Sequence, residues 1–283
     1  MAVPAFSDIA KASNDILNRD FYHVSAASLD IKSKAPNGVT FNVKGKASHE
    51  GKNAGNIEAK YADTLSGLTV TQGWSTANVL DTKIELNEKI AKGLKAEILG
   101  QFLPSSQNVV AKLNLHFKQP NFHGRAFVDA TNGPTANIDA VIGHEGFVVG
   151  VEAGYDVSKA AITRYAAAVG YSMPLYSTAV TASNNLSIFS FSYYHKVNSE
   201  VEAGAKASWD SKAGNTVGLE VAGKWRLDPT SFAKAKVNDR GIAALAYNVL
   251  LRPGVKVGIG MSFDTQHLKE ASHKVGASFE FEG

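Results

Sequence analysis

One stretch of the sequence begins like the zinc-binding helix of a metalloprotease. His144 and Glu145 open it as in the H-E-x-x-H pattern, but Val148 occupies the position of the second histidine. The other histidines are scattered, and the chain contains no cysteine, no G-x-S-x-G elbow and no P-loop. We therefore predict that the protein is not an enzyme and holds no metal and no cofactor.

The residues best placed to act on other molecules are lysines and arginines that alternate with apolar side chains. In Gly254–Asp264, for example, Lys256 and Ser262 alternate with Val257 and Ile259. Successive side chains of a β-strand point to opposite faces, so this segment predicts a strand with one polar and one apolar face. The function depends on what each face meets.

The same alternation recurs along the chain after residue 25. Clear segments are 29–32, 39–44, 57–61, 80–86, 109–117, 137–142, 147–155, 201–209, 217–226 and 274–281. Turn signals such as Pro36-Asn37-Gly38, Asn184-Asn185 and Pro253-Gly254 separate the strands. Counting the segments predicts roughly 19 strands, one every ~14 residues, in a single domain over 25–283. The alternation is least clean over 160–196.

The number of strands decides what the two faces meet. Open sheets seldom exceed about ten strands, whereas a closed barrel of about 16 strands or more leaves a lumen too wide for side chains to fill. The lumen then holds water and the apolar outer face meets lipid, where a lysine costs about 2–4 kcal/mol. Charge is almost absent from the apolar stripes. The predicted fold class is all-β, a transmembrane β-barrel of about 19 strands.

Composition and charge exclude several other classes. The 283 residues carry a net charge of +3, which is too mild to imply nucleic-acid binding. No apolar run approaches the roughly 18–20 residues that a spanning helix needs. No secretory signal is visible, and Asp8, Asp15 and Asp20 argue against a mitochondrial transit peptide because such peptides are poor in acids.

The polar faces carry more bases than acids, so we predict a lumen with weak anion selectivity. A wide pore with this lining acts through its electric field rather than through a binding site. The wall residues predicted to set selectivity and gating are Lys46, Lys60, Lys83, Lys95, Lys112, Lys224, Lys234 and Lys236. Gln72 falls on the apolar face with Val70 and Trp74, so we predict an amide that faces lipid at a cost in free energy.

Residues 1–20 are the one segment with a clear helical period. A charged stripe at spacings of three and four consists of Asp8, Lys11, Asp15 and Arg19. Ile9 and Ile16 lie on the opposite side, as in an amphipathic helix. The spacing alone favours an ordinary surface helix packed on a domain. In the gating hypothesis, voltage acts on the stripe and on the wall, at about 2.3 kcal/mol per charge for a potential of about 100 mV.

Several longer motifs are similar to those of a known family. They are MAVPAFSDIAK at 1–11, GLTVTQGWST at 67–76, AKGLKAE at 91–97, GHEGFVVG at 143–150 and WRLDPTSFAKAKVNDRGIAALAYNVLLRPGVKVGIG at 225–260. On these motifs the chain resembles the mitochondrial porins, the voltage-dependent anion channels, and is most similar to the fungal members. The resemblance runs end to end and departs at Trp225, where the family pattern has Tyr or His. The strand count agrees with the 19 strands of this family and is not independent of it.

The resemblance implies a channel of the mitochondrial outer membrane that passes ATP, ADP, phosphate and small ions. It implies that the N-terminal helix lies inside the lumen and that an odd number of strands pairs the first with the last in parallel. The implied partners are the lipid bilayer, the permeant anions and adenine nucleotides, the mitochondrial sorting and import machinery, and further copies of the chain as a homo-oligomer.

The resemblance also assigns roles to single residues. Nucleotide contacts carry over to Lys11, Arg19, Lys95, Ile242, Ala243, Ala244, Gly260, Met261, Ser262, Phe263 and Asp264. The residues that are similar to the sorting signal of mitochondrial β-barrels are Lys274, Gly276, Phe279 and Phe281.

Two departures from the animal members weaken family roles. Gln72 stands where those members often have a lipid-facing Glu, so a function that needs an ionisable carboxylate is not expected here. Asp20-Phe21-Tyr22-His23 stands where they have a glycine-rich hinge, which makes a swinging-helix gate less secure.

Two alternative functions stay open from the sequence. A protein-translocating pore of the same superfamily would carry acidic and apolar tracks in its lumen rather than an excess of bases. A soluble β-protein that binds an apolar ligand would purify without detergent.

Overall fold

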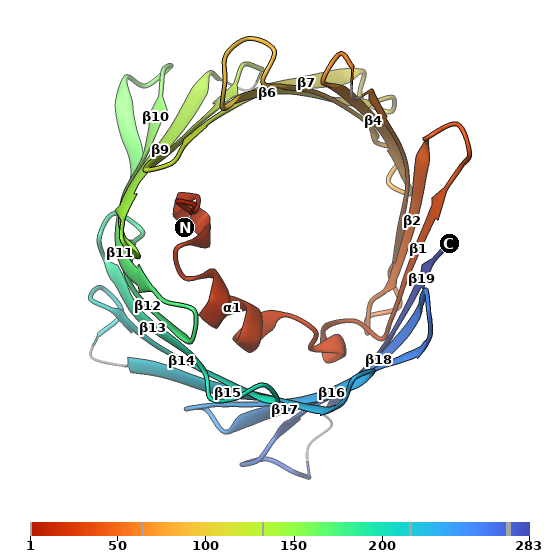
Figure 1. The fold of residues 1–283 in the computed structure, drawn as a ribbon, viewed down its shortest axis with the longest axis vertical. Coiled ribbons are helices and arrows are strands. Elements are labelled where there is room, and N and C mark those ends of the chain that lie inside the picture. The colour runs from red at the N-terminus through yellow and green to blue at the C-terminus, as the bar shows by residue number, and fades with distance from the viewer. Residues whose placement is uncertain (1, 64, 132, 215–216, 270–272) are drawn as a thin grey trace.

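The chain forms a closed ring of β-strands around an open lumen (Figure 1). The computed structural model describes residues 2–63, 65–131, 133–214, 217–269 and 273–283, and over these residues nineteen strands form one sheet. The N-terminal segment lies inside the ring, against the part of the wall that runs from β9 to β19 (Figure 1). The predicted all-β barrel with a short helix in its lumen is therefore confirmed.

The strands follow one another around the ring in chain order. They are β1 (Ala27–Lys34), β2 (Thr40–Ala47), β3 (Asn53–Asp63), β4 (Leu68–Ser75), β5 (Leu80–Asn87), β6 (Leu94–Leu103), β7 (Asn108–Gln119), β8 (Phe122–Asp129), β9 (Thr135–His144), β10 (Phe147–Asp156), β11 (Ala161–Ser172), β12 (Tyr176–Ser183), β13 (Ile188–Lys196), β14 (Val201–Asp210), β15 (Val217–Asp228), β16 (Ser231–Asn238), β17 (Ile242–Arg252), β18 (Val255–Asp264) and β19 (Lys274–Glu282).

The first and last strands close the ring in parallel. All other neighbours are antiparallel, and in a meander with an odd number of strands the two ends must run in the same direction. The β1–β19 register runs from Ala27↔Ala277 to Lys32↔Glu282. Closure leaves no unpaired strand edge in the lipid, where an unsatisfied backbone group is costly.

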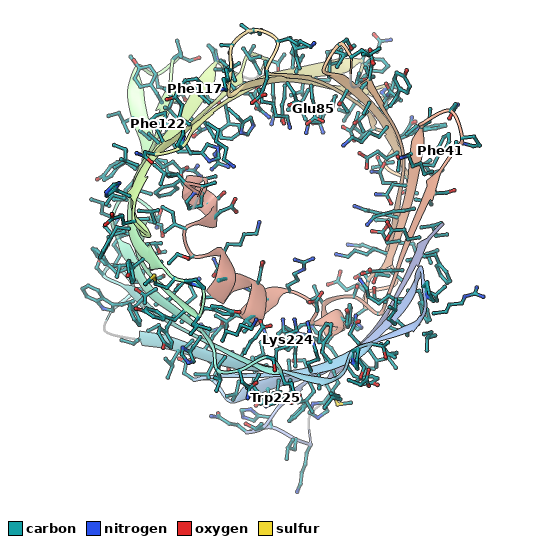
Figure 2. All side chains as sticks on the ribbon, in the orientation of Figure 1. Phe41, Glu85, Phe117, Phe122, Lys224 and Trp225 are labelled. Atoms are coloured by element: carbon teal, nitrogen blue, oxygen red, sulfur yellow. The ribbon has the colours of Figure 1, made fainter. Side chains whose placement is uncertain are left out.

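Side chains alternate between the outside and the lumen, as the sequence predicts. Phe41, Phe117 and Trp225 point outward, whereas Glu85 and Lys224 point into the lumen (Figure 2). Residues paired across neighbouring strands share a face. The registers therefore place the predicted wall lysines on the inner face: Lys46, Lys60, Lys83, Lys95, Lys112, Lys224, Lys234 and Lys236.

The strands β11 to β13 lose the clean alternation because their inner face is also apolar or small. Ala168 and Ala179 are buried on the lumen side, as is Ser192. A Cβ added at Gly170 would lie 2.8 Å from Cγ2 of Ile9, so the N-terminal segment packs directly on this wall. The inner face is covered by protein here rather than by water, and a polar pattern is not needed.

The helix of the N-terminal segment is shorter than the predicted 1–20. A 3-10 turn at Phe6–Asp8 is followed by α1 at Lys11–Asn18 and a second 3-10 turn, η2, at Tyr22–Val24. The break falls at Ala10, whose backbone (φ −99°, ψ 18°) is not helical. It allows Ile9 to pack on β11 while Ile16 packs on β14, where it meets Gly204.

The buried apolar core lies between this segment and the wall rather than at the centre of the barrel. The described side chains form three clusters: Val3, Val141 and Val148; Ile16, Leu17 and Ala222; and Phe21, Ala244 and Ala246. Each joins a part of the N-terminal segment to a different set of strands.

Within the described residues, none of the helices is both long and apolar enough to cross a membrane.

Neighbouring residues on β6 give a matched test of the two faces. Ile98 points outward, and Leu99 lines the lumen beside Lys83 and Lys112. We expect Ile98→Lys to lower the free energy of unfolding in a bilayer by about 2–4 kcal/mol, because the ammonium would lie near the bilayer midplane. Leu99→Lys adds the same charge to a water-filled lumen and should change it by less than about 1 kcal/mol. Urea unfolding in lipid vesicles measures both, and equal losses would contradict the assigned faces.

Candidate functional site

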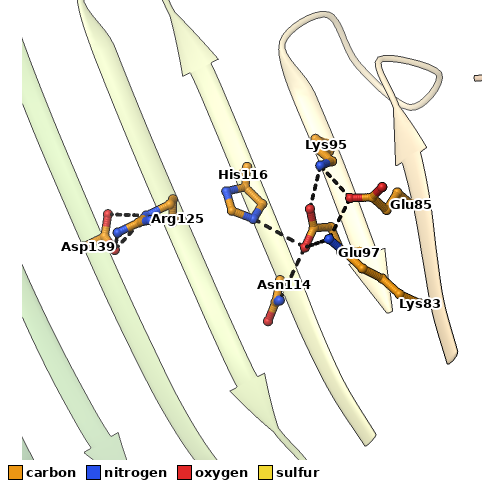
Figure 3. A network of polar contacts seen from close by, with 8 residues as sticks. All are labelled: Lys83, Glu85, Lys95, Glu97, Asn114, His116, Arg125 and Asp139. Carbon is orange, nitrogen blue, oxygen red and sulfur yellow. Dashed lines mark hydrogen bonds and ion pairs between the residues drawn. The ribbon is translucent and has the colours of Figure 1, made fainter. Parts of the chain in front are cut away.

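The lumen wall opposite the helix carries a network of paired charges on β5 and β6 (Figure 3). Lys95 Nζ lies 2.7 Å from Oε1 of Glu85 and 2.6 Å from Oε1 of Glu97. Lys83 Nζ lies 2.8 Å from Glu85 and 3.4 Å from Glu97. Glu85 and Glu97 are directly opposite in the register, and the two ammonium groups offset a repulsion that would otherwise separate the strands.

The network reaches β7, and a separate ion pair lies on β8 and β9 (Figure 3). Asn114 Nδ2 donates to Oε2 of Glu97 at 3.5 Å, and His116 Nε2 lies 3.8 Å from the same oxygen. Arg125 binds both oxygens of Asp139: Nε lies 3.1 Å from Oδ1, and Nη2 lies 2.8 Å from Oδ2. This fork geometry is the strongest form of a guanidinium–carboxylate pair.

Pairing changes the interpretation of four predicted wall lysines. Lys83 and Lys95 have carboxylate partners in the network, Lys112 lies 3.3 Å from Asp129, and Lys224 lies 3.8 Å from Glu202. Their positive charge is offset at the same place on the wall. Among the described residues, Lys46, Lys60 and Lys236 have no carboxylate oxygen within 4.0 Å, so their positive charge is not offset by a direct partner.

The charged stripe of the N-terminal segment faces the open lumen. Lys11 is 59% exposed and lies 3.8 Å from Asp8, and Arg19 is 70% exposed and lies 3.9 Å from Asp20. The apolar stripe is buried, and Leu17 has no exposed surface. The segment is therefore an amphipathic element packed on the inside of the barrel, not on the outside of a soluble domain.

Lys234 does not line open water, in contrast to its prediction as a lumen lysine. Its side chain lies beneath the end of α1 and is 3% exposed. The alternation of β16 places it correctly on the inner face, but the sequence gives no signal that a helix covers this part of the wall.

The predicted nucleotide contacts do not form one site. Lys95 lies on β6, across the lumen from α1 with Lys11 and Arg19 (Figure 1). Ala244 is buried by Phe21, and Gly260 is covered by the backbone of Tyr22.

Three of the predicted nucleotide contacts lie on the outer face of the barrel rather than in the lumen. Ala243, Met261 and Phe263 alternate with the lumen-facing residues of β17 and β18, and Ala243 and Phe263 are register partners. A solute in the lumen cannot reach their side chains, which point outward. Ile242, Ser262 and Asp264 keep the inward orientation near the end of the strands.

The side-chain amide of the lipid-facing Gln72 forms hydrogen bonds with residues of the neighbouring strand β5. Its Nε2 donates to the carbonyl oxygen of Asp81 at 3.0 Å, and Thr82 Oγ1 donates to its Oε1 at 2.8 Å. A polar group is tolerated in an apolar medium when it is paired, so the cost predicted for this amide is largely removed.

Tyr22 packs against glycines of β18, a contact that was not predicted from the sequence. A Cβ at Gly258 would overlap the ring of Tyr22, and one at Gly260 would lie 2.7 Å from its backbone nitrogen. Asn248 Nδ2 donates to the phenol oxygen. Burial raises the pKa of Tyr22 to about 12, so the phenol stays protonated. The sequence does contain a signal for this contact: Gly258 and Gly260 stand at alternate positions of one strand, and glycines on one face allow another backbone to approach.

The residues of the tail motif lie on β19. Phe279 and Phe281 point outward, and Lys274 and Gly276 are on the inner face. A Cβ at Gly276 would overlap the carbonyl oxygens of Tyr22 and Ser25. A larger residue at position 276 would therefore prevent η2 from docking, which is a structural reason for this glycine separate from any role in sorting. Next to it, burial lowers the pKa of His23, and the charges of Lys236 and Lys274 act in the same direction.

A closed ring with an apolar outer face, a charged lumen and an amphipathic segment packed inside it defines a transmembrane β-barrel pore. The sequence places it further: the chain belongs to the eukaryotic porin family, whose profile matches residues 2–276.

The relatives match over their full length. The chain is 64% identical over 282 residues to the mitochondrial outer membrane protein porin of Neurospora crassa, with 100% of both chains covered. It is 41% identical over 285 residues to the non-selective voltage-gated ion channel 1 of Saccharomyces cerevisiae, again with 100% of both covered. A solved porin variant of Rh. blastica aligns with a TM-score of 0.48 and 11% identity over 86% of this chain and 91% of that chain.

The opposed carboxylates of the network predict strong coupling between its members. We expect Lys95→Met and Glu97→Gln each to destabilise the barrel, and the double variant to lose less than the sum, with a coupling of about 0.5–3 kcal/mol. The reason is that removing Lys95 leaves Glu85 and Glu97 facing each other with one ammonium.

The matched control is the exposed pair Lys256–Glu280, whose side chains are 44% and 42% accessible at a separation of 2.7 Å. Its coupling should stay below about 1 kcal/mol. Urea unfolding of both cycles in vesicles makes the comparison, and additive losses in the network would show that the charges act independently.

Proposed function

We propose that the protein is a voltage-gated, weakly anion-selective channel of the mitochondrial outer membrane. It passes ATP, ADP, phosphate and small ions by diffusion through the lumen. The observation that carries the proposal is a closed barrel whose lumen stays open beside a docked, charged N-terminal segment. The names of the relatives, a mitochondrial outer membrane porin and a voltage-gated ion channel, support it and give no support to a translocating pore or a soluble β-protein.

The anion preference follows from the distribution of charge around the lumen. The network on β5 and β6 is internally compensated. Bases without a carboxylate oxygen within 4.0 Å lie elsewhere on the described wall, and Lys46, Lys60 and Lys236 are examples. Arg19 is also exposed to the lumen, but Asp20 lies 3.9 Å from it and offsets part of its charge. In a wide aqueous pore such charges raise the local concentration of anions without binding them tightly.

Voltage sensitivity is assigned to the charged stripe and to the wall charges. A potential acts on each charge in proportion to the part of the field that it crosses when the charge moves. Asp8, Lys11, Asp15 and Arg19 are attached to a segment that is held by packing and hydrogen bonds rather than by strand pairing. It is the element in the lumen that can be displaced without opening the barrel.

Nucleotides are proposed to make weak, exchangeable contacts with Lys11 and Arg19. Both side chains are more than half exposed on the helix, and ammonium and guanidinium groups are the usual partners of phosphate. Lys95 is proposed to be less available to phosphate than Lys11 and Arg19, because its ammonium already contacts two carboxylates.

The tail and the outer face carry the proposed interactions with other macromolecules. Lys274, Gly276, Phe279 and Phe281 on the last strand are proposed as the signal read by the mitochondrial sorting machinery. Association with further copies of the chain would use the outer face, where apolar side chains surround the ring.

Recording from single channels in a planar bilayer under a KCl gradient tests the function. We expect large conductance steps that fall at high voltage of either sign and a reversal potential that favours chloride. Lys60→Glu should shift the reversal potential toward cations, because it replaces an unpaired lumen charge. Lys212→Glu, in the loop between β14 and β15, changes the net charge equally and should shift it little, since charges beyond about 10 Å are screened at about 0.1 M salt. No conductance from folded wild-type protein would contradict the channel.

A further inference from the structure

Lys234 is buried in a wall that otherwise faces water. Its side chain is 3% exposed, and its Nζ donates to the backbone oxygen of Asp15 at 3.0 Å and to that of Arg19 at 2.6 Å. Its Nζ also lies 4.9 Å from the centre of the Phe21 ring. Among the residues that the structure describes, no carboxylate oxygen lies within 4.0 Å of it.

These partners are the C-terminal end of α1. The carbonyl oxygen of Asp15 also accepts from the backbone N–H of Arg19 at 3.1 Å, whereas Arg19 is the residue just past the helix. The helix dipole makes this end negative, which favours a cation here. Helices usually end in a glycine turn or carry a base in their own last turn, but the last turn of α1 contains no base. The cation comes instead from β16, more than 200 residues away in the sequence.

The other contacts of α1 are neutral and distributed. Ile16 and Leu17 pack on Ala222, and Ser13 Oγ donates to the carbonyl oxygen of Ala205 at 3.2 Å. A charged donor to two carbonyl groups contributes more than a neutral hydrogen bond, and an apolar side chain at this position would leave both carbonyl oxygens without that donor.

We propose that Lys234 is the positioning residue that holds α1 against the barrel wall. Removing its ammonium takes the charged donor from Asp15 O and Arg19 O and allows the helix to leave the wall more often. We call this contact between Lys234 and the end of α1 the latch. Any effect of the latch on voltage gating rests on the proposed channel function, but the docking of α1 by Lys234 does not.

The cysteine-free chain allows a direct test of the latch. Ser13→Cys places a thiol where the side chain is 2% exposed, so a charged, water-soluble maleimide reaches it when α1 leaves the wall. The reporter is combined with Lys234→Met, with Lys234→Arg, which keeps the charged donors, or with Lys60→Met. The last is the matched control, because it removes one lumen charge from β3 while α1 packs on β13, β14 and β15.

We expect Lys234→Met to speed labelling in lipid vesicles by about tenfold or more, and the other two variants to leave the rate within about twofold of the reporter alone. Equal rates for Lys234→Met and Lys60→Met, whether unchanged or both raised, would overturn the proposal. If Lys234→Met does not insert, Lys234→Gln applies the same test with a neutral donor too short to span both carbonyl groups. Labelling needs no current, so a failure of the latch is distinguishable from a failure of the channel.

Discussion

The structure depends on one constraint: every backbone N–H and C=O group that lies in lipid must be paired within the protein. A sheet satisfies this only when it has no edge, and the parallel pairing of β1 with β19 removes the last one. Closure of so many strands leaves a lumen that side chains cannot fill. The two faces of each strand must then differ, with apolar side chains outside and polar side chains inside. The charge pattern of the lumen follows from the closure.

The lumen is not uniform, because the N-terminal segment covers one side of it. That side is built from small residues, and positions such as Gly204 and Gly258 leave room for Ile16 and Tyr22. The opposite side carries the compensated network of Glu85 and Glu97 with their lysines. A permeating ion therefore passes between the paired charges of β5 and β6, which are fixed in the sheet, and the exposed charged stripe of the inserted segment. Only the second of these can change its position without breaking the sheet.

The parts of this arrangement that follow a local rule could be predicted from the sequence. Strict alternation, as in Gly254–Asp264, predicted both the strand and the face on which each side chain lies. A shift of the strand by one residue would move its apolar side chains into the lumen and its polar side chains into the lipid. The rule failed over β11 to β13, where the docked helix removes the need for a polar inner face. The family resemblance supplied the position of the helix, which the helical period alone did not.

Contacts between distant segments could not be predicted. The opposition of Glu85 and Glu97 depends on the register of β5 and β6, and alternation does not specify the register of a hairpin. The burial of Lys234 depends on a helix that lies far away in the sequence. Lys95 and Lys234 are both correctly assigned to the lumen face. Each has a local partner, carboxylates for Lys95 and helix carbonyl groups for Lys234, which reduces the effect of its charge on ions in the lumen.

Cysteine scanning of β2 tests most directly whether closure separates lipid from water on a strand that the helix does not cover. Single cysteines from Thr40 to Lys46 are treated with a charged, water-soluble thiol reagent while current is recorded in a bilayer. The barrel predicts reaction and reduced current at Thr40, Asn42, Lys44 and Lys46, and no reaction at Phe41, Val43 and Gly45. Reaction without this two-residue period, or at the odd positions, would contradict a lumen lined by one face of each strand.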